Sequence, residues 1–300
     1  MGCTVDEVLD DQAAGLRRLL ARNPVRVVTL ASGREGVGKT SDVLNLAVAL
    51  AKRGRNVMVL DENPEERNLS HFLGLPSHYD LLQVMRREKT LEEVTQHGPE
   101  DIGIVSAARG VRELASLDDD GREWLVHSFT QFSRTPDVIL VDALAGAEKN
   151  MLSLSLAAQE IVVAVSSQPA SITDAYALIK VLSQQYGRRR FRILVNKVGA
   201  EDARAIFGNM AHAAKRFLKV TLDLMGHVPL DEKLGQSSRL GRSVVEAFPE
   251  TASAANFRQL AEVLEQWPCP KDDTGQLRGF MQRLIHSSRV AAEGLSSGMS

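Results

Sequence analysis

The sequence predicts an α/β fold in which a mainly parallel, twisted sheet is covered by helices on both faces. Two observations lead to this prediction. Short runs of β-branched and other apolar residues recur along the chain, and segments with helical apolar spacing separate most of them. Such runs are typical of strands buried on both faces, and their alternation with helices is typical of parallel strands joined by crossovers.

The expected elements follow one another from residue 25 to residue 267. The predicted strands, nearly all apolar, are 25–31, 56–61, 102–106, 138–142, 161–166, 191–196 and, more weakly, 225–228. The predicted helices, with apolar residues every three or four positions, are 40–52, 122–132, 173–186, 203–218 and 252–267. We therefore expect a central domain of residues 24–267. An N-terminal helical segment (1–23) precedes it, and a linker, an amphipathic helix and a flexible tail (268–300) follow it.

Composition limits the class of protein but not its chemistry. The 36 basic and 38 acidic residues give a net charge of −2, which argues against a general nucleic-acid coating protein. No apolar run approaches the ~18 residues of a membrane span. The two cysteines, Cys3 and Cys269, lack the spacing of a metal site, so a reducing cytoplasm is the expected setting.

A phosphate-binding loop is predicted between the first strand and the first helix. Residues 33–40 read GREGVGKT and fit the pattern GxxxxGK[ST] in the strand-to-helix position that the pattern requires. Gly36 and Gly38 allow the backbone to turn its N–H groups toward a phosphate at the helix N-terminus. Lys39 supplies a positive charge, and the Thr40 hydroxyl is a hard oxygen ligand that suits Mg²⁺. The alternative interpretation is a glycine-rich turn with a chance lysine.

The loop resembles that of a known family. Residues 32–40, SGREGVGKT, are similar to the deviant Walker A motif SGKGGVGKT of the MinD/ParA ATPases. The resemblance implies a MinD-like P-loop NTPase fold, ATP and Mg²⁺ as cofactors, and an ATP-bound homodimer in which a signature lysine reaches the partner's nucleotide. Arg34 stands at the signature position in this chain, and a guanidinium is not equivalent to an ammonium. Glu35 replaces a family glycine and brings a carboxylate near the expected phosphates.

Two further strands end in acids that match the family pattern. Asp61 is similar to the carboxylate near Mg²⁺ and the attacking water, although it could also cap a strand end. Asp142 resembles the Walker B aspartate, and the residues after it, 143–146, are similar to the switch that senses the γ-phosphate. Many members carry another aspartate where this chain has Asn63, which cannot act as a base. The implied roles are catalysis by Arg34, Lys39 and Asp61, and Mg²⁺ binding by Thr40 and Asp142, partly through water.

A later strand ends in Asn196, within the segment VNKVG (195–199). This segment could be mistaken for the NKxD motif of GTPases, but Gly199 replaces the acid that would read guanine. In the MinD-like family the equivalent asparagine contacts adenine, and residues 228–231 resemble the segment that borders the base, so the resemblance implies ATP. The residues expected to bind the nucleotide are Gly33, Gly36, Val37, Gly38, Lys39, Thr40, Ser41 and Asn196.

Within this family the chain most resembles the FlhG (FleN) flagellar-number regulators. Residues 11–17, DQAAGLR, are similar to the DQAxxLR segment that precedes the FlhG core, and residues 241–257 are similar to a C-terminal FlhG stretch. The resemblance implies that the N-terminal segment contacts an FlhF-type GTPase. The contacting residues would be Asp11, Gln12, Leu16 and Arg17. The alternative is an amphipathic helix packed on its own core.

The C-terminal segment carries a basic amphipathic pattern. Apolar residues recur at helical spacing, arginines accompany them, and no acid lies between Gly275 and Ala292. This pattern is typical of a helix that lies on an anionic membrane. The expected anchor residues are Phe280, Met281, Leu284 and Ile285. A helix packed on the core or on a partner protein is the alternative interpretation.

The combined prediction is an ATP-dependent switch that dimerises, associates reversibly with the inner face of the cell membrane, and controls flagellar number or placement. ATP hydrolysis is expected to be slow, because Arg34, Glu35 and Asn63 depart from the family pattern. A flagellar transcription regulator or C-ring proteins are further candidate partners, and no specific nucleic acid is expected. Two alternatives stay open: a ParA-type chromosome or plasmid partition ATPase, and a scaffold of the same fold without hydrolysis.

Overall fold

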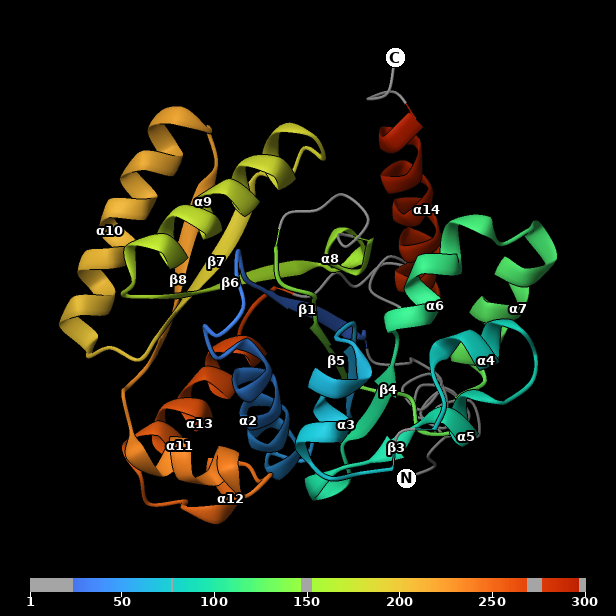
Figure 1. The fold of residues 1–300 in the computed structure, drawn as a ribbon, viewed down its shortest axis with the longest axis horizontal. Coiled ribbons are helices and arrows are strands. Elements are labelled where there is room, and N and C mark those ends of the chain that lie inside the picture. Colours follow the sequence, from blue (N-terminus) through green and yellow to red (C-terminus); the bar gives the residue numbers. More distant parts are fainter. Residues whose placement is uncertain (1–23, 77, 147–152, 269–276, 297–300) are drawn as a thin grey trace, which may run out of the picture.

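The computed structural model describes residues 24–76, 78–146, 153–268 and 277–296. Within these ranges the centre is an eight-stranded sheet with the order β3-β4-β2-β5-β1-β6-β7-β8 (Figure 1). Neighbouring strands run parallel, except at the edge, where β3 and β4 are antiparallel. The strands are β1 (Arg26–Ala31), β2 (Val57–Asp61), β3 (Gln96–His97), β4 (Gly103–Ser106), β5 (Val138–Asp142), β6 (Glu160–Ser166), β7 (Arg190–Asn196) and β8 (Thr221–Val228).

This arrangement confirms the predicted α/β fold with a mainly parallel sheet. Six of the seven predicted strands lie within one residue of their expected bounds. Strand β8 begins at Thr221 rather than Met225, because it is an edge strand whose buried residues are separated by partly exposed ones instead of forming an apolar run. Strand β3 has only two residues, which is too short for any periodic signal.

Two layers of helices enclose the sheet (Figure 1). On one face α2 and α13 pack together over an apolar cluster that includes Leu44, Val48 and Phe257. On the other face a second cluster includes Phe129 of α7 and Leu178 of α9. The helices are α2 (Lys39–Lys52), α3 (Leu69–Phe72), α4 (Leu81–Met85), α5 (Leu91–Val94), α6 (Ala108–Glu113), α7 (Asp119–Thr130), α8 (Ser153–Ala157), α9 (Pro169–Gln184), α10 (Ala200–Phe217), α11 (Glu232–Arg239), α12 (Val244–Ala247), α13 (Ala252–Glu265) and α14 (Leu277–Ser296).

The apolar face of α14 is part of the core. Phe280, Met281 and Leu284 are fully buried, Ile285 is 8% exposed, and the helix packs against α7 and α8 (Figure 1). The prediction that these four side chains anchor the protein on an anionic membrane is therefore wrong for this conformation. Side chains that are buried against the protein's own helices present no surface to a lipid.

Polar contacts fix α14 in the same position. Arg283 Nε donates a hydrogen bond to the carbonyl oxygen of Ala157 at 2.9 Å, and Ser287 Oγ donates one to that of Ser153 at 2.8 Å. A cation at the C-terminus of α8 is favourable because the last helical carbonyls carry partial negative charge. The alternative interpretation, a helix packed on its own core, is the one that holds.

The predicted partner-binding residues Asp11, Gln12, Leu16 and Arg17 lie outside the described residues. Among the helices of the described ranges, none combines the length and the apolar composition needed to cross a bilayer.

Candidate functional site

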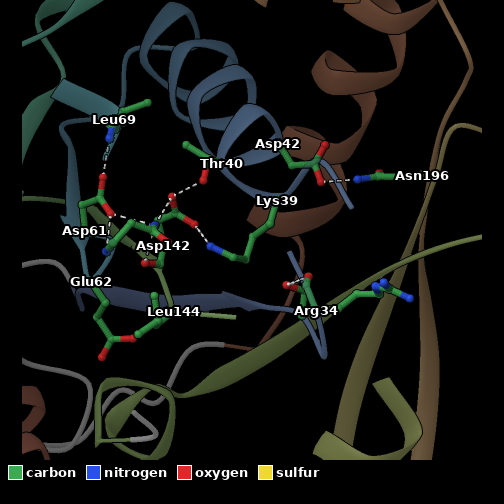
Figure 2. A network of polar contacts seen from close by, with 12 residues as sticks. Arg34, Lys39, Thr40, Asp42, Asp61, Glu62, Leu69, Asp142, Leu144 and Asn196 are labelled. Carbon is green, nitrogen blue, oxygen red and sulfur yellow. Dashed lines mark hydrogen bonds and ion pairs between the residues drawn. The ribbon is translucent and has the colours of Figure 1, made fainter. Parts of the chain in front are cut away.

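The carboxyl ends of the central strands bring the predicted site residues together. The loop 32–38 joins β1 to α2, and β2, β5 and β7 end in Asp61, Asp142 and Asn196. Asp61 and Asp142 are direct neighbours in the register of β2 and β5. Ligands of open parallel sheets bind at this edge. Residues from four separate segments of the sequence therefore meet around one loop (Figure 2).

Two glycines allow the loop to take its path. A Cβ atom at Gly33 would lie 2.1 Å from the backbone carbonyl carbon of Asp174, so only glycine lets the loop pass α9. Gly38 has φ +110°, a conformation that residues with side chains rarely adopt, and it precedes α2 without a side-chain cap. The N-terminus of α2 is therefore open toward the loop, which is the arrangement that binds phosphate.

Lys39 and Thr40, the first residues of α2, both contact Asp142. Lys39 Nζ forms an ion pair with Asp142 Oδ1, and Thr40 Oγ1 donates a hydrogen bond to Oδ2 at 2.7 Å (Figure 2). The Lys39 side chain is 6% exposed and that of Asp142 is fully buried. A buried charge is tolerated only when it is paired, so each of these two groups holds the other in place.

Asn63 bridges the two aspartates. Its Nδ2 donates to Asp61 Oδ1 and to Asp142 Oδ2, each at 2.8 Å. Burial, and then the negative charge of Asp142, raises the pKa of Asp61 to about 7. A side-chain amide can donate to both carboxylates but cannot remove a proton from water. In this arrangement Asn63 relieves the repulsion between the two acids and supplies no base.

Asn196 braces the loop from the end of β7. Its buried Nδ2 donates to the carbonyl oxygen of Val37 at 3.2 Å. It also donates to the carboxylate of Asp42 (Figure 2). Sequence reasoning missed Asp42, whose pKa burial raises to about 8 although the hydrogen bond from Asn196 acts in the opposite direction. The signal was present, because Asp42 lies three residues after Lys39 on one helix. The contact between Asn196 and adenine stays a prediction.

Glu62 is a second buried acid that sequence reasoning missed. Its Oε2 accepts a hydrogen bond from the backbone N–H of Leu144 at 3.1 Å (Figure 2). The side chain is 5% exposed, and burial raises its pKa to about 8. Glu62 thereby holds the segment 143–146, which the family pattern predicts to be the γ-phosphate switch. Glu62 stands alone after a strand and is not part of any periodic pattern in the sequence. Its burial is therefore visible only in the folded structure.

A cavity of about 250 Å³ opens beside the loop. On its exposed side Arg34 Nε lies 3.8 Å from Asp174 Oδ2, and Arg67 Nη1 lies 2.5 Å from Glu35 Oε2. The predicted site residues that line the cavity are Arg34, Gly36, Val37, Gly38, Lys39, Thr40 and Ser41. The other predicted residues, Gly33, Asp61, Asp142 and Asn196, are not among its lining residues.

The sequence profile of the CobQ/CobB/MinD/ParA nucleotide binding domain matches residues 28–244 of this chain. This range contains the loop, the strand-end acids, Asn63 and Asn196. The chain belongs to this family.

Individual members of the CobQ/CobB/MinD/ParA family match most of the chain. Antiactivator FleN of Pseudomonas aeruginosa is 36% identical over 271 residues, which are 90% of this chain and 97% of FleN. MinD in the MinC:MinD cell division protein complex of Aquifex aeolicus is 25% identical with a TM-score of 0.63, covering 82% of this chain and 97% of that one. MinD of Pyrococcus horikoshii, solved with Mg-ADP, is 23% identical with a TM-score of 0.61, covering 81% and 96%, and shows the shared fold.

The residues of this family member fit a nucleotide and Mg²⁺. Lys39 and the N-terminus of α2 supply positive charge for phosphates. The Thr40 hydroxyl and the Asp142 carboxylate are hard oxygen ligands that lie next to each other, joined by a hydrogen bond of 2.7 Å, and Mg²⁺ prefers ligands of this kind. The ion would neutralise phosphate charge. Lys39 pairs with that same carboxylate, and its ammonium has three donors, so a bound phosphate would either share Lys39 with Asp142 or displace it from Asp142.

Proposed function

We propose that this chain is an ATP-dependent switch of the MinD type that regulates the number or placement of flagella. The observation that carries the proposal is the 36% identity with antiactivator FleN along 90% of the chain. The convergence of Lys39, Thr40 and Asp142 at a complete GxxxxGK[ST] loop supports the nucleotide-dependent part. The resemblance of residues 11–17 to the FlhG segment supports the flagellar part.

In this proposal ATP with Mg²⁺ occupies the cavity and favours pairing of two copies, with Arg34 reaching toward the partner's nucleotide. Arg34 is 42% exposed, and its ion pair with Asp174 is a weak restraint because water screens it. Hydrolysis is slow, because Asn63 donates to both aspartates and leaves no base at that position. The protein acts in the cytoplasm, and α14 is not assigned a membrane role.

Light scattering during size-exclusion chromatography tests the switch. With Mg²⁺ and ATP we expect the mass of a dimer, and with Mg²⁺ and ADP that of a monomer. The Lys39→Ala variant should stay monomeric with either nucleotide, and a parallel phosphate-release assay reports turnover. A mass that does not respond to ATP would contradict the switch. Salt-dependent binding to DNA of arbitrary sequence would instead favour a partition ATPase.

The cellular role needs a separate measurement. In the organism that encodes the chain, deletion of its gene should change the number or position of flagella seen by electron microscopy. Wild-type protein should restore the normal pattern, and Lys39→Ala should not. Purified protein should also stimulate an FlhF-type GTPase, and Gln12→Ala with Leu16→Ala should remove that stimulation. Unchanged flagella after deletion would reject the flagellar role while leaving the nucleotide switch intact.

A further inference from the structure

Two residues that depart from the MinD/ParA loop pattern are charged, and each has a counter-ion on a neighbouring element. Arg34 pairs with Asp174 of α9, and Glu35 pairs with Arg67 at the end of the 3₁₀ turn η1 (Glu65–Arg67). All four side chains are between 42% and 67% exposed. The two pairs are therefore similar in solvent access and opposite in the sign of the charge that the loop contributes.

Glu35 is an unfavourable residue for a phosphate site. Among the described residues that line the cavity it is the only acid, and it shares the lining with Arg34, Lys39 and Arg67. A carboxylate beside a triphosphate lowers affinity by like-charge repulsion, which water screens only in part. A positive charge next to Glu35 would reduce this repulsion.

We propose that Arg67 determines nucleotide affinity in this chain by neutralising Glu35, and the inference rests on the nucleotide-binding function proposed above. Arg67 follows β2, whereas Glu35 belongs to the loop after β1, so the ion pair joins two walls of one cavity. The contact is direct, between Nη1 and Oε2, and it keeps a guanidinium beside the cavity. Arg67 compensates for the loss of the family glycine at position 35.

The Arg34–Asp174 pair supplies a matched control with the opposite sign. Removing Arg67 leaves a loop carboxylate without its partner, whereas removing the charge of Asp174 leaves a loop cation without its partner. The neutralisation model therefore predicts weaker nucleotide binding in the first case and equal or tighter binding in the second. A general disturbance of the loop would weaken binding in both.

The test is calorimetric titration of full-length wild type and variants with Mg-ADP and with the non-hydrolysable β,γ-imido analogue of ATP. Arg67→Ala should weaken binding of the ATP analogue about three- to tenfold. It should weaken binding of ADP by less, because ADP carries fewer phosphate charges for the unpaired carboxylate to repel. Arg67→Lys should keep most of the affinity, and Glu35→Gly combined with Arg67→Ala should regain it. Asp174→Asn should not weaken binding, and higher salt should shrink every difference.

Several results would overturn the inference. Unchanged or tighter binding by Arg67→Ala would show that the pair does not aid phosphates or that it competes with them. Equal weakening by Asp174→Asn, or no recovery in the Glu35→Gly variant, would show a structural rather than an electrostatic effect. If wild type binds neither nucleotide, the proposed function fails and this inference fails with it. If wild type binds and Arg67→Ala is indistinguishable from it, only this inference fails.

Discussion

The site has an inner half, the buried residues behind the cavity, and an outer half at the exposed side of the cavity, and the two hold their charges in different ways. In the inner half Lys39 and Asp142 are at most 6% exposed, and Asn63 bridges two buried acids. In the outer half both ion pairs are between 42% and 67% exposed. Removing one partner of a buried pair costs about 3–5 kcal/mol, whereas an exposed pair contributes about 0–1 kcal/mol. The inner charges therefore contribute to the stability of the folded protein, whereas the outer ones can be substituted with little effect on stability.

The largest expected effect comes from Lys39→Ala. It removes a fixed charge from the phosphate site and leaves Asp142 buried without its counter-ion, so nucleotide binding should fall more than about 100-fold and the melting temperature should drop. Titration calorimetry and differential scanning calorimetry measure the two effects. Lys52→Ala is the matched control, because Lys52 lies at the other end of α2 in an exposed pair with Glu100. Wild-type affinity in Lys39→Ala would refute the phosphate role of this lysine.

Asn63→Asp tests whether the inner half tolerates another charge. The change places a third carboxylate against Asp61 and Asp142, so without Mg²⁺ the melting temperature should fall by several degrees at pH 8. The loss should be smaller at pH 5, where the cluster can hold protons, and smaller with added Mg²⁺ and nucleotide. An equal loss at both pH values would show that the amide matters for shape and not for charge.

Glu62→Gln should change how stability depends on pH. Burial raises the pKa of Glu62 from its usual 4.5 to about 8, so the folded protein keeps a proton that the unfolded chain releases in this window. Its contribution to stability is complete below the window and is lost as pH rises through it. Between pH 5 and 8.5 the variant should therefore lose a few degrees less in melting temperature than wild type. Parallel melting curves for the two proteins would exclude this titration.

The smallest expected effect on stability is that of Arg67→Ala. Its ion pair with Glu35 is exposed, so the melting temperature should move by less than about 2 °C even though nucleotide affinity changes. Differential scanning calorimetry without nucleotide checks this expectation. A shift in melting temperature as large as that of Lys39→Ala would show that the exposed ion pair contributes as much to stability as the buried one.

The central strands and the loop could be predicted because each is determined by a short, continuous segment of the sequence. A strand buried on both faces needs a continuous apolar run, and a phosphate loop needs glycines, lysine and a hydroxyl at fixed spacing. Parallel strands then bring their carboxyl ends to one edge, so Asp61, Asp142 and Asn196 could be expected near the loop.

The inward acids and the docking of α14 could not be predicted in the same way. Asp42 and Glu62 become buried only when β7 and the segment after β5 close over them. The apolar spacing around Phe280 shows that one helix face is covered, but a protein core and a membrane demand the same spacing. Which of the two covers α14 depends on the surfaces of α7 and α8, which lie far away in the sequence.

In the proposed function, the Lys39–Asp142 ion pair would link the binding of nucleotide to the binding of metal. A phosphate that draws Lys39 away would leave Asp142 without its counter-ion, although Thr40 and Asn63 would still donate hydrogen bonds to it, and a cation that binds Asp142 would release Lys39 for the phosphate. Each ligand therefore removes an obstacle to the other, and this positive cooperativity must be reciprocal. The site would therefore bind the magnesium–nucleotide complex more favourably than either component alone.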